Sequence, residues 1–308
     1  MQLSIVATLY NSAPFVPEFY RRAKAAADAV TPDHEIVLVN DGSPDDSLAL
    51  AVELHRRDAR VRVVDLSRNF GHHKAMMTGL AQSRGQLVFL IDSDLEEEPE
   101  LLARFHAELT RTGADVVYGV QARRKGGLFE RVSGGLFFHV FNFLSSQPIP
   151  ANLLTVRLMT RRYVEALVAH RERETVIAGL WAMTGFQQQP LSVNKGSRTA
   201  TSYDLGRKLL LLVNSITSFS DRPLVFIFHL GLSISALASL AAFYLVVRRL
   251  FFGELLAGWP SLIVSVWLLG GLTLFCLGIL GVYLSKVFIE TKQRPYVVIR
   301  KVHEREPD

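Results

Sequence analysis

Two long runs without a charged side chain, Leu224–Val247 and Ser261–Ser285, constrain the fold of this chain more than any other feature. A helix rises 1.5 Å per residue, so about 20 residues span the hydrocarbon core of a bilayer, and both runs exceed that length. A pair of buried core helices is the alternative, but core helices of soluble proteins seldom run this far without a charge. We therefore expect two membrane-spanning helices in the last third of the chain.

The distribution of Lys and Arg predicts how these helices are oriented. Basic residues gather before the first run and after the second, whereas Arg248 and Arg249 are the only basic residues of the connecting segment. Since basic loops stay in the cytoplasm, we expect the N-terminal part and both termini in the cytosol, in a multi-pass protein of the inner (cytoplasmic) membrane. The first ten residues read as a strand and not as a signal peptide, which agrees with this orientation.

The overall composition narrows the function classes. The chain has 308 residues, 49% of them apolar, and a formal net charge of +5 from 34 basic and 29 acidic side chains. This apolar fraction excludes a disordered or fibrous chain. The basic side chains form no stripe for nucleic acid, which we do not expect as a partner, but suit anionic substrates or a membrane surface. The single cysteine, Cys276, excludes a disulfide framework and a cysteine-built zinc site.

Short apolar runs alternate with helical periodicity in the first part of the chain. The runs expected as strands buried on both faces are Leu3–Leu9, Glu35–Asn40, Val61–Leu66 and Leu87–Asp92. The segments expected as amphipathic helices are Phe15–Val30, Asp45–Arg57, Ala75–Arg84 and Glu100–Arg111. This alternation predicts a mostly parallel, doubly wound α/β sheet, in which ligands bind at the carboxyl ends of the strands.

The acidic sequence after the fourth run is the sharpest candidate site. Asp92 and Asp94 lie one residue apart at a strand end, point the same way, and repel each other unless a cation lies between them. Carboxylates together with phosphate oxygens suit Mg²⁺ or Mn²⁺, and Glu96 is a candidate third contact. The alternative is an acidic helix start, to which we assign the glutamates that follow Glu96.

Two other strand ends carry polar residues. Asp41 follows the second strand beside Gly42 and Ser43, where a base N–H or a ribose hydroxyl could reach its carboxylate, and Asp45 is expected to cap the next helix. The pair His72-His73 is too divergent in direction for joint metal ligation. For this pair, packing at a helix start and contact with a nucleotide stay open.

Two further segments are amphipathic. Leu128–Ser146 and Lys208–Phe219 each combine a broad apolar face with scattered polar residues. Both could lie in the membrane interface, and both could pack on the sheet. The second precedes the first uncharged run directly, which favours the interface for that segment.

Together these motifs resemble a known family. The segments Thr8–Asn11, Val39–Asp46 and Asp92–Leu95 are similar to the catalytic domain of glycosyltransferase family 2, which has the GT-A fold. The later part resembles the polyprenyl-phosphate glycosyltransferases, a group that includes dolichol-phosphate mannose synthases and bacterial undecaprenyl-phosphate sugar transferases. That likeness rests on Gly185-Phe186, Ser202-Tyr203, Arg207-Lys208, Ser215–Ser220, Arg222–Leu224 and Arg294-Pro295.

The resemblance implies a domain organisation along the whole chain. Residues 1–200 would form a cytosolic GT-A domain, 201–223 a juxtamembrane interface helix, 224–285 a two-helix transmembrane hairpin, and 286–308 a basic cytosolic tail. The fold expected is thus a doubly wound, mostly parallel sheet followed by interfacial amphipathic helices and two transmembrane helices. A homo-oligomer stays open.

The resemblance also implies a role for each matching residue. The nucleotide would be held by Thr8, Leu9, Tyr10, Asn11, Asp41, Gly42 and Ser43. Asp92 and Asp94 would be the catalytic, metal-binding pair, with Glu96 where many relatives carry Gln. The acceptor phosphate would meet the basic residues Arg123, Arg124, Arg131 and Arg198, although a solvated loop or lipid headgroup attraction also accounts for such a cluster.

One position departs from the family pattern. Relatives carry an Asp, often discussed as a catalytic carboxylate, where this chain has Thr155. A phosphate monoester acceptor has a second pKa of about 6, so it is largely ionised at neutral pH and needs no base, whereas a hydroxyl acceptor does. The expected function is therefore a membrane-anchored inverting transferase that moves a sugar from a nucleotide donor to a polyprenyl phosphate such as undecaprenyl phosphate, for cell-surface glycan synthesis. The alternatives are a transferase acting on a lipid-linked saccharide or other hydroxyl acceptor, and an inactive nucleotide-sugar-binding scaffold.

Overall fold

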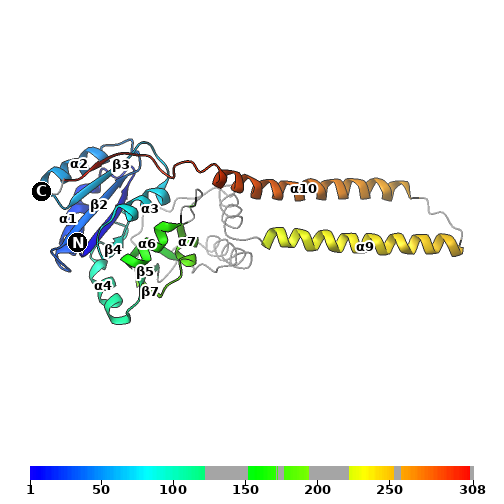
Figure 1. The fold of residues 1–308 in the computed structure, drawn as a ribbon, viewed down its shortest axis with the longest axis horizontal. Coiled ribbons are helices and arrows are strands. Elements are labelled where there is room, and N and C mark those ends of the chain that lie inside the picture. Colours follow the sequence, from blue (N-terminus) through cyan, green and yellow to red (C-terminus); the bar gives the residue numbers. More distant parts are fainter. Residues whose placement is uncertain (122–151, 171, 173–176, 194–221, 253–257, 306–308) are drawn as a thin grey trace. The chain divides into compact units, whose positions relative to one another are not determined.

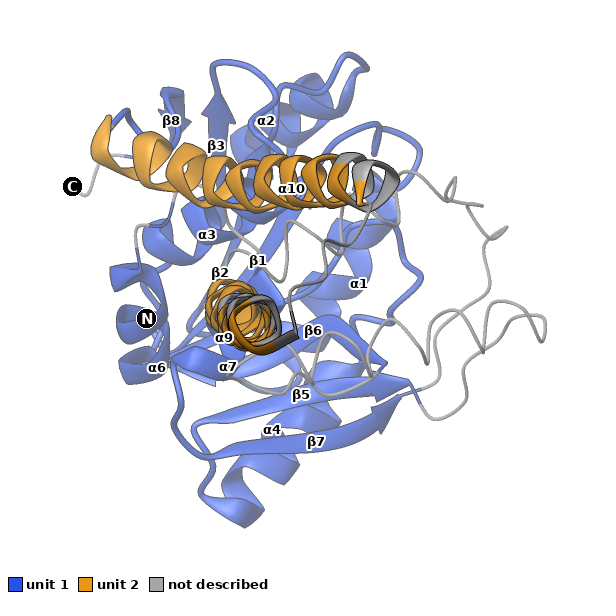
Figure 2. Cartoon of the chain, turned by 90° about the vertical axis from the view of Figure 1, so that its right-hand side faces the viewer, with its two compact units in different colours: residues 1–138, 147–204, 294–308 blue, residues 139–146, 205–293 orange. Residues whose placement is uncertain are grey.

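The computed structural model describes residues 1–121, 152–170, 172, 177–193, 222–252 and 258–305. The chain forms two compact units. The first comprises residues 1–138, 147–204 and 294–308, and the second comprises 139–146 and 205–293 (Figure 2). The helices predicted over Leu128–Ser146 and Lys208–Phe219, and the interface segment 201–221, lie outside the described residues.

The first unit is built on one mixed sheet of eight strands (Figure 1). In spatial order the sheet runs β7-β5-β6-β4-β1-β2-β3-β8. The strands are β1 (Leu3–Leu9), β2 (His34–Asn40), β3 (Val61–Leu66), β4 (Leu87–Leu90), β5 (Val116–Gln121), β6 (Leu153–Thr160), β7 (Gln188–Val193) and β8 (Ile299–His303). Four of the seven pairings are parallel, and those of β6 with β4 and β5 and of β3 with β8 are antiparallel.

Helices cover both faces of the sheet. They are α1 (Val16–Asp28), α2 (Ser47–Arg57), α3 (His72–Gln82), α4 (Leu101–Thr112), α6 (Arg161–Ala169) and α7 (Ile177–Met183). The main core joins alternate residues of β1, such as Ile5, to Phe19 of α1 and Phe105 of α4. Helix α3 packs on β1, β2 and α6. The four predicted strands and helices of the first 112 residues are confirmed, as is the doubly wound α/β fold, with β4 ending at Leu90 and α3 beginning at His72.

The last strand comes from the far end of the chain. Strand β8 pairs antiparallel with β3, with Val63 opposite His303 and Asp65 opposite Lys301. Just beyond it, Glu304 forms ion pairs with Arg62 at 2.8 Å and Arg84 at 2.7 Å. The segment predicted as a basic tail after the second uncharged run thus contributes an edge strand to the sheet, which the sequence alone did not indicate.

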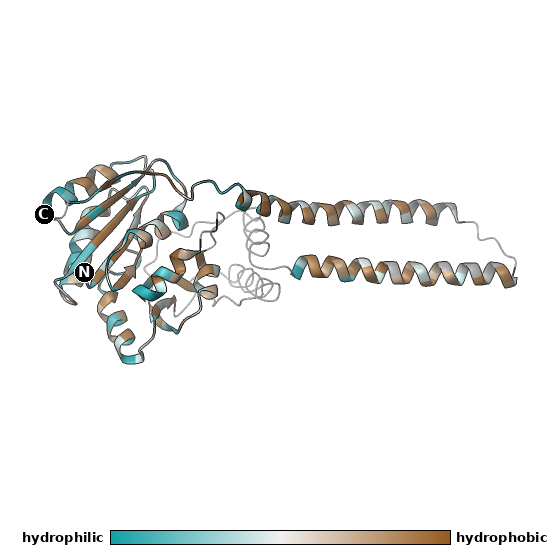
Figure 3. Ribbon diagram, in the orientation of Figure 1, coloured by the Kyte–Doolittle hydropathy of each residue, from teal (hydrophilic) through white to brown (hydrophobic). Residues whose placement is uncertain are grey.

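The second unit contains the two long apolar helices. They are α9 (Arg222–Phe252) and α10 (Trp259–Thr291), and hydrophobic residues dominate both (Figure 3). The windows Arg222–Ala241 and Ser265–Thr291 have a mean hydropathy of 2.1, and none of their residues is buried. By length and composition, each helix could cross a membrane.

Candidate active site

The carboxyl ends of β1 and β2 bring most of the predicted nucleotide-binding residues together. The strands pair in parallel up to Leu9 opposite Asn40, so the loops that follow them leave the sheet at the same edge. The Asn11 amide donates to the Ser43 hydroxyl at 2.8 Å, which joins the two loops directly. Asn11 has φ +52°, a left-handed conformation that Asn tolerates and that turns the chain sharply after the strand.

Asp41 organises the neighbouring loop. Its carboxylate is buried and accepts hydrogen bonds from the backbone N–H groups of Phe70, at 2.7 Å, and Gly71, at 3.1 Å. Burial raises the pKa of Asp41, against the opposing effect of these two N–H groups and of nearby His72 and Arg68. The sequence predicts that this carboxylate contacts a nucleotide, and in this structure both of its oxygens hold the main chain of residues 70 and 71.

Gly42 allows its loop to pack closely against the backbone of residues 68 and 69. It has φ +60°, and a Cβ atom at this position would lie 2.4 Å from both the Arg68 carbonyl carbon and the Asn69 nitrogen. Such a distance is far inside van der Waals contact, so a residue with a side chain would force the loops apart.

Asp45 ties the same loop to the start of α2. Its Oδ1 accepts from the hydroxyls of Ser43 and Ser47, both at 2.5 Å, and from the Ser47 backbone N–H at 3.1 Å. The N-cap residue of α2 is Asp46, so Asp45, the expected cap, lies one residue before it and holds the first residue of the helix. Its Oδ2 accepts from the Ala13 amide at 2.9 Å. Burial acts to raise the pKa of Asp45, but these donors outweigh it and lower the pKa to about 2.

The Asp45 bonds predict a pH-dependent contribution to stability. A carboxylate whose pKa falls from 3.8 to about 2 on folding contributes stability above pH 3.8, and that contribution is lost as the pH falls towards 2. We expect Asp45→Asn to cost about 1–2 kcal/mol at pH 7, after allowance for solvent screening of this partly exposed group, and less at pH 3. Thermal unfolding at both pH values measures the difference. Asp46→Asn, at an exposed neighbour, should show no comparable change with pH.

The acidic motif lies at the carboxyl end of β4, beside β1. The buried Ser93 hydroxyl donates to the Thr8 carbonyl oxygen at 2.8 Å, which fastens the motif to the end of β1. Asp94 Oδ1 accepts from the Glu96 amide at 3.0 Å across a turn in which Leu95 has φ +62°. Asp92 and Asp94 are both partly exposed, so this edge of the sheet presents two carboxylates beside the predicted nucleotide loops.

The Asp92 carboxylate fits a cation. Its Oδ1 atom is buried and accepts no well-formed hydrogen bond from the described residues, and its nearest basic atom is His72 Nε2 at 3.3 Å. A buried carboxylate oxygen in this state favours a positive charge beside it. Among the described residues, no three His, Cys, Asp or Glu side chains form a cluster that could hold a metal ion. A cation bound by Asp92 and Asp94 would therefore draw further oxygen ligands from a bound substrate and water.

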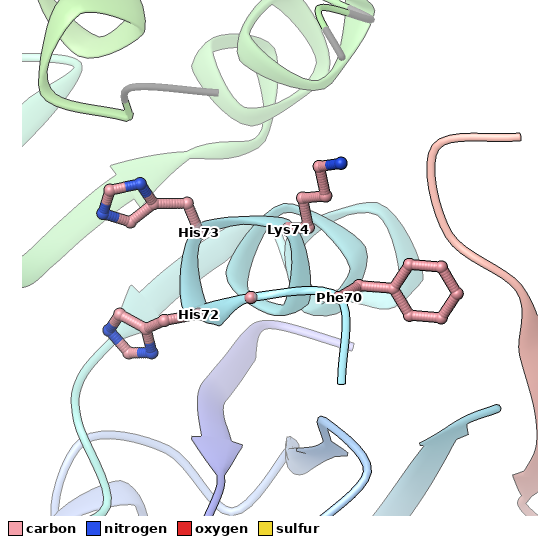
Figure 4. Close-up of a pocket in the computed structure, with 5 residues that line it drawn as sticks. Phe70, His72, His73 and Lys74 are labelled. Atoms are coloured by element: carbon pink, nitrogen blue, oxygen red, sulfur yellow. The ribbon is translucent and has the colours of Figure 1, made fainter. Parts of the chain in front are cut away.

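His72 is a site residue whose role the sequence left open. Its Nδ1 lies 3.1 Å from the Thr8 hydroxyl, and its Nε2 faces Asp92, so it links the ends of β1 and β4. Burial lowers its pKa, but the neighbouring Asp92 carboxylate and the charges of Asp41 and Asp94 outweigh this effect, and the net shift is upward. Figure 4 shows His72 and His73 extending to one side of the start of α3 and Phe70 to the other. The pocket there, about 260 Å³, is lined by Phe70, Gly71, His72, His73 and Lys74.

The sequence predicts Glu97 in an acidic helix start, but α4 begins only at Leu101 and Glu97 lies in the loop before it. Its side chain is buried. Burial lowers the pKa of Arg157 in β6 to about 9, and the negative charge of the Glu97 carboxylate opposes this shift. Arg157 donates to the carbonyl oxygens of Thr155 and Leu154 and stacks on the Trp181 ring. The motif around Thr155 therefore lies in the core strand β6, with a buried cation two residues on.

The predicted acceptor-phosphate residues lie outside the described residues; they are Arg123, Arg124, Arg131 and Arg198. Of the other predicted residues, Thr8 is buried under His72, and Tyr10 is exposed at the end of β1.

Comparison with known proteins gives one family. The profile of "Glycosyl transferase family 2" matches residues 4–168. A protein of Mycobacterium tuberculosis assigned to the glycosyltransferases is 58% identical over 303 residues, 98% of this chain and 89% of that protein. The SfII prophage-derived bactoprenol glucosyl transferase of Shigella flexneri is 32% identical over 310 residues, 100% of both chains.

Similar solved structures are more distant. Mannosyl-3-phosphoglycerate synthase from Rubrobacter xylanophilus has 19% identity and a TM-score of 0.49, over 71% of this chain and 73% of that chain. Glucosyl-3-phosphoglycerate synthase from Mycobacterium tuberculosis, in complex with Mn²⁺, UDP-glucose and phosphoglyceric acid, has 20% identity and a TM-score of 0.46, over 70% and 79% of the two chains.

Proposed function

Because the chain belongs to glycosyl transferase family 2, we propose that it moves a sugar from a nucleoside-diphosphate donor to the phosphate of a polyprenyl lipid at a membrane surface. The observation that carries the proposal is the meeting of the Asp92–Asp94 motif with the Asp41–Ser43 loop at one edge of the sheet. Relatives named bactoprenol glucosyl transferases match this chain along its whole length, both apolar helices included, which supports a polyprenyl acceptor.

The donor would lie across the carboxyl ends of β1, β2 and β4. Thr8–Asn11 and Asp41–Ser43 would bind the nucleoside, with Asp41 acting through the main chain of residues 70 and 71 that it holds. Asp92 and Asp94 would hold Mg²⁺ or Mn²⁺, and the bound ion would neutralise charge on the diphosphate that leaves. Ser93 keeps both carboxylates in place through its bond to β1.

The acceptor chemistry accounts for Thr155 in β6. A polyprenyl phosphate is already an anion at neutral pH, so it can attack the anomeric carbon without giving up a proton first. One displacement of the nucleoside diphosphate by this phosphate inverts the anomeric centre. The motif in which relatives carry Asp is described in this structure as part of β6. It contains the buried Arg157 and no carboxylate.

The two apolar helices support a place in the cytoplasmic membrane. Each is long enough to cross a bilayer, and a catalytic unit with both chain ends on the cytosolic side would meet the lipid acceptor where that acceptor is confined.

Acceptor selection tests the proposal. The full-length chain in lipid nanodiscs would be given labelled UDP-, dTDP- and GDP-sugars with Mn²⁺, and undecaprenyl phosphate or undecaprenol as acceptor. We expect mass spectrometry to detect a sugar on the phosphate and none on the alcohol, and we expect EDTA to stop the reaction. Transfer only to a lipid-linked saccharide would favour the hydroxyl-acceptor alternative. Undiminished transfer in EDTA would contradict the role of Asp92 and Asp94 as cation ligands.

A further inference from the structure

We propose that the C-terminal strand β8 is part of the donor site, and that Arg300 on this strand positions the nucleotide-binding loops. This inference deepens the proposed function and rests on it, because it concerns the residues assigned there to the donor. Strand β8 is separated from those loops by more than 200 residues of sequence, yet it pairs with β3, which pairs in turn with β2, the strand that leads into Asp41–Ser43.

Arg300 begins a series of hydrogen bonds that crosses the sheet. Its Nη1 donates to Asp65 Oδ2 at 3.3 Å, and Asp65 Oδ1 accepts from Asn40 Nδ2 at 2.8 Å. Asp65 and Asn40 are buried and lie opposite each other on β3 and β2. Loss of one partner leaves a buried carboxylate incompletely hydrogen-bonded, which costs desolvation free energy. The bonds of Asp65 to Arg300 and Asn40 therefore depend on one another.

The series continues into the loop that would hold the nucleotide. Asn40 Oδ1 accepts from the Ser43 amide at 3.3 Å, and the Ser43 hydroxyl accepts from the Asn11 amide at 2.8 Å. The orientation of the Asn40 side chain therefore depends on Asp65 at one end and fixes the turn at Gly42 and Ser43 at the other. A substitution of Arg300 is therefore expected to affect the loop through Asp65 and Asn40, since each of these side chains bonds one neighbour on either side of it in the series.

Residues 296–300 also contact both ends of the loop that follows β3. Arg300 Nη2 donates to the Ser67 carbonyl oxygen at 2.6 Å, and the Ser67 amide donates to the Val298 carbonyl oxygen at 2.9 Å. Beyond the loop, Lys74 Nζ lies 5.5 Å from the centre of the Tyr296 ring, within range of a cation–π contact. Residues 68–73, which carry the amides held by Asp41, are thus enclosed between two contacts with the tail.

Arg300 is exposed enough to be replaced without opening the core, because 57% of its side chain is accessible whereas only 4% of Asp65 is. The test compares Arg300→Gln with Lys301→Gln, which removes one positive charge from the next, exposed residue of the same strand. Arg300→Lys keeps the charge but loses the paired donors of the guanidinium. All variants would be full-length chains in nanodiscs.

The measurement is the Kd for UDP, dTDP or GDP with Mn²⁺, using whichever nucleotide the unaltered chain binds, together with the donor KM and kcat. We expect Arg300→Gln to raise Kd and KM by about fivefold or more, the order expected for a lost charge-assisted hydrogen bond, with kcat within about twofold. Arg300→Lys should fall between, and Lys301→Gln should match the unaltered chain. Amide exchange at residues 40–43 should accelerate in Arg300→Gln and stay unchanged in Lys301→Gln.

Equal effects of Arg300→Gln and Lys301→Gln would overturn the inference, as would a fall in thermal stability of Arg300→Gln with nucleotide affinity intact. A chain that binds none of the three nucleotides would overturn it too. If Arg300→Gln fails to fold, Arg300→Lys carries the same comparison. Failure of transfer to undecaprenyl phosphate, with the difference in nucleotide affinity intact, would remove the proposed acceptor and leave the role of Arg300 standing.

Discussion

Replacement of Asp94 or Asp92 by Asn is expected to lower kcat for sugar transfer on the order of 10³-fold, because each change removes a negative charge that would hold the cation at the leaving diphosphate. Asn is nearly the same size as Asp and can still accept the hydrogen bond from the Glu96 amide, so the turn at Leu95 should survive. The change tests charge at this position and leaves shape largely intact.

The matched control is Glu98→Gln, which removes one charge from an exposed position in the same acidic segment. Its kcat should stay within about threefold of the unaltered chain, since an exposed charge is screened by water. Electron paramagnetic resonance of Mn²⁺ in the presence of UDP gives a second readout, in which Asp94→Asn should weaken ion binding. An Asp94→Asn enzyme that retains a tenth or more of its activity would contradict the assignment.

Replacement of Gly42 by Ala is expected to cost at least about 3 kcal/mol and to abolish nucleotide binding, since strain from the left-handed backbone adds to a clash with a neighbouring loop. The new methyl group would lie 2.4 Å from two backbone atoms, the Arg68 carbonyl carbon and the Asn69 nitrogen. Backbone cannot move aside as a flexible side chain can, so the loop held by Asp41 must shift.

Gly113 separates the two causes. It also has a left-handed backbone, at φ +65°, but among the described residues no atom beyond its own chain neighbours lies within 4 Å of where its Cβ would stand. Gly113→Ala should cost only about 1 kcal/mol, the price of the conformation alone, and should leave nucleotide affinity unchanged. Thermal unfolding followed by tryptophan fluorescence, with Kd for UDP, measures both variants. Similar losses in the two would show that the approach of Gly42 to residues 68 and 69 is unimportant.

The first half of the fold could be predicted because each strand is specified locally. Runs such as Leu3–Leu9 and Val61–Leu66 are rich in Val, Ile and Leu and flanked by polar turns, and both strands have the predicted bounds. The parallel arrangement then places Asp41 and Asp92 at one edge of the sheet, as expected from the alternation of strands and helices.

The first residue of α3 could not be predicted from the apolar periodicity, although packing at a helix start was one of the two interpretations open for His72-His73. The apolar periodicity begins near Ala75, but the helix begins at His72, whose ring lies against Thr8 and Asp92. Those partners are distant in sequence, so no window around residue 72 contains them. The burial of Glu97 could not be predicted for a similar reason, because Arg157 of β6, on which its charge acts, is distant in sequence.

Strand β8 is the clearest case of a long-range determinant. Read alone, Ile299–His303 is a short, basic stretch with two charged residues in five, typical of a solvated tail. It becomes a strand because β3 offers unpaired backbone groups and because Asp65 and Arg62 of β3 find their ionic partners on Arg300 and Glu304. The pairing is visible only once both strands exist.

The same strand has a practical consequence for anyone who wants a soluble fragment. A truncation that stops before the apolar helices also discards β8, and it leaves β3 as a bare edge with open N–H and C=O groups, a template for aggregation. Rejoining residues 294–308 to the truncated domain through a Gly/Ser linker is expected to restore the missing edge of the sheet.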